Sequence, residues 1–143
     1  EYVERLRRLA AGDARLHLAG PYQGQAALSK ILRELDVIVV PSVWYENSPN
    51  VILEAFAHRV PVLVSNLGGM AELVNDGVDG LRFAPGDAAD LARCLRRLVE
   101  EPELLPRLRA GISPIKSVAE EMQELERVYQ QVRQQHQSAP ESA

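Results

Sequence analysis

The sequence predicts an α/β domain with a doubly wound parallel sheet, and three observations support this fold class. First, short runs such as 37–40 and 60–64 consist mainly of Val, Ile and Leu, which is typical of strands covered on both faces. Second, segments with apolar residues at helical spacing separate these runs. Third, strands that alternate with helices pair in parallel through right-handed crossovers, with helices on both faces of the sheet.

Local patterns place the individual elements along the chain. Strands are predicted near 15–19, 37–41, 60–65 and 81–83. Helices are predicted over 1–10, 26–35, 48–59, 70–74, 88–100, 103–110 and 115–132. Asp87 is the expected N-cap of the helix over 88–100, because Asp accepts hydrogen bonds from the first backbone amides of a helix. The polar segment 134–143 is predicted to be a disordered tail.

Composition excludes several classes of function. A formal net charge of -4 gives no electrostatic reason to expect a nucleic-acid partner, and the arginines of "RLRR" and "RCLRRL" alternate with leucines as on solvated helix faces. Cys94 is the single cysteine, so no intramolecular disulfide or cysteine metal cluster is possible. No apolar run reaches the roughly 18 residues of a transmembrane segment, and no signal peptide is visible. These features together indicate a cytoplasmic protein.

The loop "PSVWYENSP" is the most promising place for a ligand. Open parallel sheets bind ligands beyond the carboxyl ends of their strands, and this strand-to-helix loop is the longest and the richest in polar and aromatic groups. Ser48 is a suitable N-cap and Pro49 suits the first helical position. Asn50 and Val51 would then offer free backbone N–H groups at the positive end of the helix dipole. The sequence therefore predicts an anion site, with a phosphate as the usual ligand.

Two glutamates flank this predicted anion site, Glu46 before the helix and Glu54 within it. Asn50, Glu54 and His58 form a polar stripe at a spacing of four residues, which faces either water or a cleft. In a cleft, the two carboxylates would accept hydrogen bonds from hydroxyls on either side of a diphosphate. A nucleotide sugar has this layout, but the spacing alone does not decide between the two interpretations.

A longer stretch resembles a known family. The segment "PSVWYENSPNVILEAFAHRVPVLVSNLGGMAELVNDGVDGLRFAPGDAADLARCL" is similar to the C-terminal nucleotide-sugar-binding domain of retaining GT-B glycosyltransferases, the glycogen-synthase-like and mannosyltransferase-like group. The resemblance extends over nearly the whole chain and implies a Rossmann-like fold, the second half of a GT-B fold. Its matching positions are Glu46, Glu54, Gly68, Gly69, Glu72, Gly80, Pro85, Gly86 and Asp87.

The resemblance also implies a role for each part of the site. The expected ligand is a UDP-, GDP- or ADP-sugar, transferred to an acceptor hydroxyl with retained configuration, without a cofactor or metal and with no catalytic residue in this chain. The implied contacts are the donor sugar at Glu46, Asn47 and Ser48, the diphosphate at the backbone of Pro49, Asn50 and Val51, the ribose at Glu54, and the base at Pro21 and Tyr22.

The chain departs from the family pattern in what it lacks. The family's opening strand, with a Gly-Arg turn and a following lysine, would lie before Glu1, and so would an acceptor-binding domain. Residues 1–133 are therefore expected to be a partial nucleotide-sugar-binding domain that is inactive alone. The missing domain leaves open a peripheral attachment to a membrane.

Two other classes of function remain as alternatives. A non-catalytic nucleotide-sugar-binding module would keep the same binding residues. A dinucleotide-binding oxidoreductase shares the α/β pattern, but the sequence contains no G-x-G-x-x-G. Among single residues, Trp44 and Tyr45 are expected to stack on a sugar or seal the loop. Gly68 and Gly69 are expected to allow a tight turn and a close backbone approach, with Glu72 capping the next helix.

Overall fold

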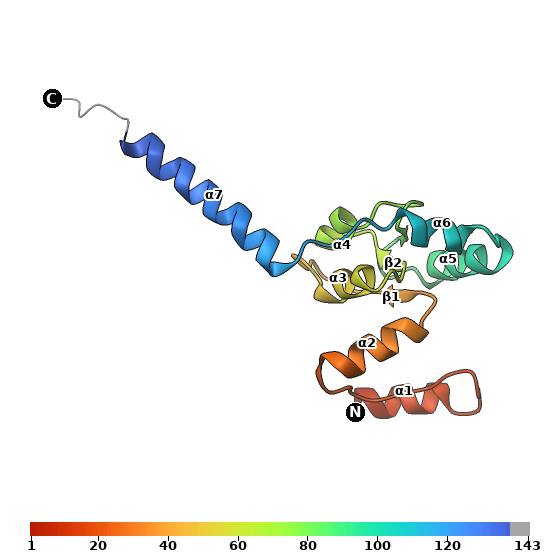
Figure 1. Ribbon diagram of the computed structural model, residues 1–143. Coiled ribbons are helices and arrows are strands. Elements are labelled where there is room, and N and C mark those ends of the chain that lie inside the picture. Colours follow the sequence, from red (N-terminus) through yellow and green to blue (C-terminus); the bar gives the residue numbers. More distant parts are fainter. Residues whose placement is uncertain (138–143) are drawn as a thin grey trace. The chain divides into compact units, whose positions relative to one another are not determined.

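The computed structural model describes residues 1–137, which fall into two compact units, the first covering Glu1–Glu34 and the second beginning at Leu35 (Figure 1). The first unit contains helices α1 (Tyr2–Ala10) and α2 (Gly24–Glu34). The strand predicted near 15–19 is wrong, because this segment is irregular and Leu16 and Leu18 are exposed. A strand needs a neighbour for its backbone hydrogen bonds, and no described segment pairs with this one.

The second unit is built on a three-stranded sheet in the order β1 (Ile38–Val40), β2 (Val62–Ser65) and β3 (Gly80–Phe83). Both pairings are parallel, with Val40 beside Val64 and Val64 beside Arg82. Three of the four predicted strands are thus confirmed, as is their parallel direction. The apolar runs form strands here because every residue of β2 is buried.

Helices cover both faces of this sheet, which confirms the doubly wound arrangement (Figure 1). On one face, α3 (Asn50–Ala57) and α4 (Gly68–Leu73) pack on Val62 and Val64 through Ile52, Phe56 and Met70. On the other face, α5 (Ala88–Glu100) and α6 (Leu104–Gly111) pack on Leu63, Leu81 and Phe83 through Cys94, Leu104 and Leu108. Alternating strand residues therefore face two separate cores.

The capping prediction is confirmed at the start of α5 and wrong at the start of α3. Asp87 is the N-cap of α5, as predicted, and its side chain accepts hydrogen bonds from the N–H groups of Ala89 and Asp90. The start of α3 differs from the prediction, because its N-cap is Pro49 and no side chain caps it. Ser48 is therefore not the cap. With Pro49 in an extended conformation (φ -67°, ψ 111°), the helix begins at Asn50.

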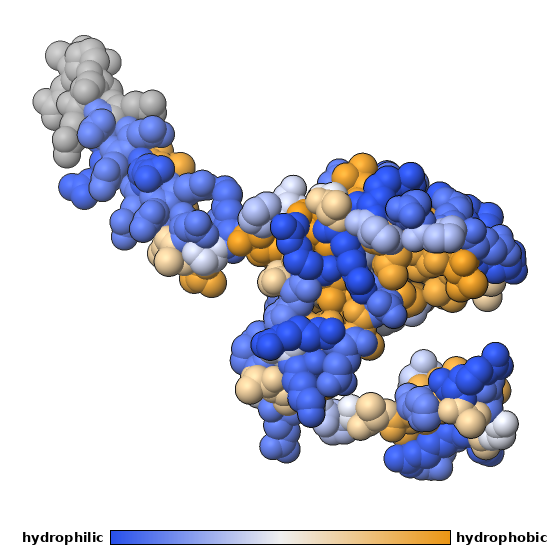
Figure 2. All heavy atoms as spheres, turned by 45° about the vertical axis from the view of Figure 1, so that its right-hand side comes forward, coloured by the Kyte–Doolittle hydropathy of each residue, from blue (hydrophilic) through white to orange (hydrophobic). Residues whose placement is uncertain are grey.

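The last helix, α7 (Val118–Gln137), is longer than the helix predicted over 115–132. It continues through the first four residues of the segment 134–143 that was predicted to be disordered, so that prediction is wrong for 134–137. The rest of that prediction lies outside the described residues. Apolar residues are exposed both on α7 and elsewhere in the second unit (Figure 2). Among the described residues, no helix combines the length and apolar character that crossing a membrane requires.

Candidate functional site at the carboxyl edge of the sheet

The loop between β1 and α3 is closed by a hydrogen bond between the side chains of Ser42 and Glu46. Ser42, which is 9% exposed, follows β1 by two residues. Its Oγ donates a hydrogen bond to Glu46 Oε1 over 2.7 Å. The residues between these two, Val43, Trp44 and Tyr45, are all exposed. The side-chain bond therefore closes a short loop whose aromatic tip faces solvent.

The same loop rests on the first residues of α4. The N–H of Gly69 donates to the carbonyl oxygen of Glu46 over 2.9 Å. A Cβ added at Gly69 would lie 1.8 Å from the carbonyl oxygen of Asn47, so only glycine fits there. Gly68 has a φ of +50° and lies against the ring of Tyr45. The predicted close backbone approach at both glycines is confirmed. Glu72 lies inside α4, which has no side-chain cap, so the predicted capping role is wrong.

The first turn of α3 is open to an acceptor from outside the described residues. Pro49 has no N–H, so of the three residues predicted to bind a diphosphate through the backbone only Asn50 and Val51 can donate. Neither amide has a hydrogen-bond acceptor in the described part of the chain. The partial positive charge of the helix dipole is greatest at these amides. This geometry suits an anion.

Glu54 lies one turn further along α3 and is half-buried. It is four residues after Asn50, about 6 Å along a helix axis at ~1.5 Å per residue. Its carboxylate contacts no hydrogen-bond partner among the described residues. His58, the C-cap of α3, lies 2.8 Å through Nδ1 from the carbonyl oxygen of Glu54. The polar stripe is thus only partly exposed, with Asn50 exposed and Glu54 and His58 half-buried.

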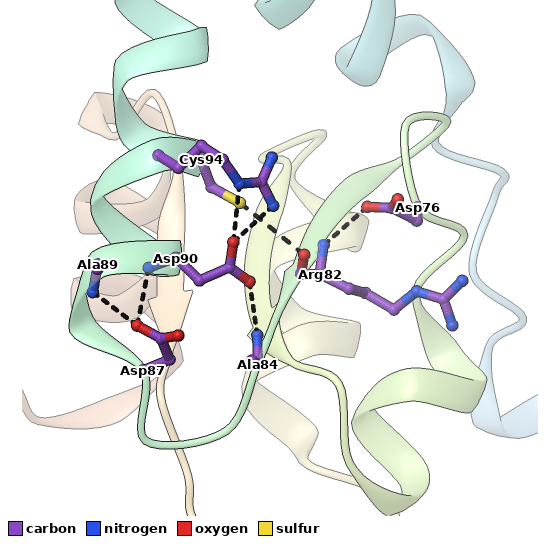
Figure 3. A network of polar contacts seen from close by, with 8 residues as sticks. Asp76, Arg82, Ala84, Asp87, Ala89, Asp90 and Cys94 are labelled. Atoms are coloured by element: carbon purple, nitrogen blue, oxygen red, sulfur yellow. Dashed lines mark hydrogen bonds and ion pairs between the residues drawn. The ribbon is translucent and has the colours of Figure 1, made fainter.

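At the start of α5, at the same edge of the sheet, the amides of Ala89 and Asp90 already have a side-chain acceptor (Figure 3). Asp87 accepts from two amides of the first turn, and Asp90 accepts from the N–H of Ala84 and from Arg93. These bonds hold the pKa of Asp90 below its usual value, the backbone bond from Ala84 most strongly. A hollow of about 170 Å³ beside this helix is mainly apolar, and its lining contains none of the predicted site residues.

The structure brings most of the predicted site together in one continuous segment. Residues 46–51 form the end of the loop and the start of α3, and Glu54 follows within the helix. Pro21 and Tyr22, predicted for the base, are exposed residues of the first unit. Sequence reasoning did not single out Ser42. Its signal was weak, a serine two residues beyond a buried strand with a glutamate four positions later. The described residues contain no group of three or more His, Cys, Asp or Glu side chains placed to bind a metal.

The sheet and the helix start at its edge first define a class of protein. The chain contains an open parallel α/β sheet of the Rossmann-like type, with an uncapped helix start and two carboxylates at its carboxyl edge. Residues 1–101 match the family described as "Glycosyl transferases group 1". This chain belongs to that family, which confirms the resemblance drawn from the sequence.

Individual relatives agree with this assignment. The chain is 37% identical over 110 residues to a D-inositol 3-phosphate glycosyltransferase of Streptomyces bingchenggensis, covering 76% of this chain and 24% of the relative. It is 40% identical over 75 residues to a glycogen synthase of Mycobacterium tuberculosis, covering 52% of this chain and 18% of the relative. The chain therefore spans a quarter or less of the length of these curated relatives.

A solved structure supports the fold independently. The crystal structure of Anabaena HepE in complex with UDP-glucose superposes with a TM-score of 0.64 at 25% identity, over 78% of this chain and 30% of that protein. Sucrose-phosphate synthase from Thermosynechococcus elongatus superposes with a TM-score of 0.74 at 26% identity, over 91% of this chain and 34% of that protein, and the predicted Rossmann-like fold is confirmed.

Proposed function

We propose that this chain is the donor-binding part of a retaining glycosyltransferase, acting within a longer protein that transfers a sugar from a nucleoside diphosphate sugar to an acceptor hydroxyl. The observation that carries the proposal is the start of α3, where two amides that have no acceptor among the described residues lie between two carboxylates. The family membership and the UDP-glucose bound by the HepE structure support the same ligand class.

Charge decides which part of the ligand goes where. Glu46 and Glu54 repel phosphate and accept hydrogen bonds from hydroxyls, so they suit the donor sugar and the ribose, respectively. The diphosphate lies between them on the N–H groups of Asn50 and Val51. Asn47 and Ser48, both exposed, extend the sugar-binding side of the loop. Pro21 and Tyr22 remain the residues proposed for the base.

The proposed chemistry is departure of the nucleoside diphosphate through an oxocarbenium-like transition state. The helix start stabilises the negative charge that develops on the leaving group, and the carboxylates orient the substrate without attacking it. No Lys or Arg occurs between Arg33 and Arg59, so the loop and the first turns of α3 supply no cation for the diphosphate. We therefore propose that residues 1–143 alone bind the donor weakly and do not transfer sugar.

A titration followed by NMR tests the proposed binding site. Adding UDP, GDP or ADP to the isotope-labelled chain should shift the amide signals of Asn50, Val51 and their neighbours. The amides of Ala89 and Asp90, which already donate to Asp87, provide the matched internal control and should not move. If none of the three nucleotides shifts the α3 signals, or if α5 responds equally, the binding site is assigned wrongly.

A turnover measurement on the intact protein tests the reaction. The longer protein should release nucleoside diphosphate from one of UDP-glucose, GDP-mannose or ADP-glucose, and the product should keep the anomeric configuration of the donor. Binding without turnover in the intact protein would instead support the non-catalytic module.

A further inference from the structure

Ser42 and Glu46 form an isolated pair. Ser42 is buried, and its hydroxyl lies 2.7 Å from Glu46 Oε1. Within the described residues, this hydroxyl is the sole hydrogen-bond donor to the Glu46 carboxylate, and no cation lies within ion-pairing distance of it. One carboxylate oxygen is therefore held, while Oε2 is available to a ligand.

The backbone of Glu46 is held as well. Its carbonyl oxygen accepts from the N–H of Gly69, and an added Cβ at Gly69 would collide with the next carbonyl, that of Asn47. The main chain of Glu46 is thus held by α4, and its side chain is held by Ser42, which follows β1 by two residues. Without the Ser42 bond, the side chain would rotate about its three χ angles from a fixed backbone.

We propose that Ser42 is a positioning residue that orients the Glu46 carboxylate toward the donor sugar. The inference rests on the proposed sugar-binding role of Glu46. A hydroxyl suits this task because a hydrogen bond to a carboxylate is stronger than one between neutral groups. A hydroxyl is also a neutral donor, whereas a lysine or arginine at the same place would form an ion pair with the carboxylate and compete with the sugar hydroxyls for its oxygens. Holding one oxygen before the ligand arrives reduces the entropy lost on binding.

The role predicts a selective defect in the intact protein. Ser42→Ala should lower kcat/KM for the nucleotide sugar that the wild type uses by about 10-fold, the size expected for one charge-assisted hydrogen bond. The affinity for the corresponding nucleoside diphosphate, measured by calorimetry, should stay within about 2-fold, because that ligand lacks the sugar. Ser42→Thr keeps the hydroxyl and should restore most of the activity.

A double-mutant cycle separates positioning from general damage to the loop. In the Glu46→Ala background, Ser42→Ala should have no further effect on kcat/KM, since no carboxylate remains to be oriented. Melting curves should show that each variant is folded.

The results that overturn the inference differ from those that overturn the proposed function. If Ser42→Ala is silent while Glu46→Ala is damaging, or if Ser42→Ala weakens the nucleoside diphosphate and the nucleotide sugar equally, Ser42 does not position Glu46. An undiminished effect of Ser42→Ala in the Glu46→Ala background has the same meaning. If Glu46→Ala itself leaves turnover unchanged, both the inference and the proposed role of Glu46 fail.

Discussion

Helices α3 and α5 begin at the same edge of one sheet, yet their first turns are completed in different ways. At α5 a side chain of the chain itself caps the helix, because the Asp87 carboxylate accepts hydrogen bonds from the amides of Ala89 and Asp90 (Figure 3). At α3 the cap is Pro49, and the amides of Asn50 and Val51 have no acceptor among the described residues. A capped helix start contributes stability, whereas an uncapped one keeps its donors available for a ligand.

The loops before the two helices differ in the same sense. Before α3, the loop is held by a contact from elsewhere in the fold, the N–H of Gly69 on α4, and by the buried hydroxyl of Ser42 within the loop. Before α5, the connection is held by local bonds, such as that from the Ala84 amide to Asp90. The α3 start therefore has a defined shape without using its own donors. Substitutions at each end should have different consequences.

The largest expected effect comes from filling the contact between α4 and the α3 loop. Gly69→Ala would place Cβ 1.8 Å from the carbonyl oxygen of Asn47, which is backbone and has little room to move. We expect a loss of about 3 kcal/mol in unfolding free energy, at the upper end for overpacking, and a loss of nucleotide-sugar binding. Urea denaturation measures the first and calorimetry the second.

Gly77→Ala provides a control for the loss of a glycine in itself. Gly77 has a φ of +75°, with no atom within 4 Å of an added Cβ. It should cost about 1 kcal/mol through backbone strain alone and leave ligand binding intact. Equal costs at both glycines would show that the contact with the α3 loop is less rigid than the structure indicates.

The next effect concerns the carboxylate one turn into α3. In the intact protein, Glu54→Gln keeps the size of the side chain and loses its charge, so it should weaken both nucleoside diphosphate and nucleotide sugar by about 2 kcal/mol. Glu46→Gln should leave the nucleoside diphosphate nearly unchanged and reduce sugar recognition and turnover. Titration calorimetry with both ligands separates the two roles.

Glu100→Gln, at the exposed end of α5, is the control for a change of net charge. It should alter neither affinity. Wild-type binding of nucleoside diphosphate by Glu54→Gln would mean that Glu54 belongs to a solvated stripe.

A smaller effect compares the two helix starts directly. Asp87→Ala removes a carboxylate that accepts from two amides of α5 and should reduce the unfolding free energy by about 1 kcal/mol. Ser48→Ala removes a hydroxyl that makes no capping bond to α3 and should change it by less than about 0.5 kcal/mol. Thermal denaturation of the two variants measures the difference. A comparable loss in Ser48→Ala would show that α3 is capped in solution.

The two regions also show what sequence patterns predict well. Strands β1 and β2 followed from runs of apolar residues, β3 from the short stretch "GLRF" after a turn, and the Asp87 cap from residues within one turn of it. Such features depend on near neighbours in the chain. The α3 start was misassigned because Ser48 has the right chemistry for a cap but its side chain is not used.

Features of the α3 loop depend on distant parts of the fold and could not be predicted in the same way. The bond from Gly69 to the carbonyl of Glu46 joins residues 23 positions apart, and the strand predicted near 15–19 lacks a partner among the described residues. The Ser42–Glu46 bond spans only four positions but requires a loop conformation that sequence does not specify. The candidate residues were therefore identifiable from the sequence, while their positioning was not.

The smallest expected effect is a pH dependence of the unfolding free energy that arises from Asp90 at the start of α5. The amide of Ala84 and, next, the guanidinium of Arg93 lower the pKa of Asp90 below its usual value of 3.8. The unfolded state then binds the proton more readily than the folded state. The stability from this carboxylate is present above about pH 4 and is lost as the pH falls through the lower folded pKa. Asp90→Asn removes this contribution, so the stability difference between wild type and variant should narrow between about pH 5 and pH 3. Urea denaturation at a series of pH values measures it, and a difference that stays constant or widens on acidification would contradict the assignment.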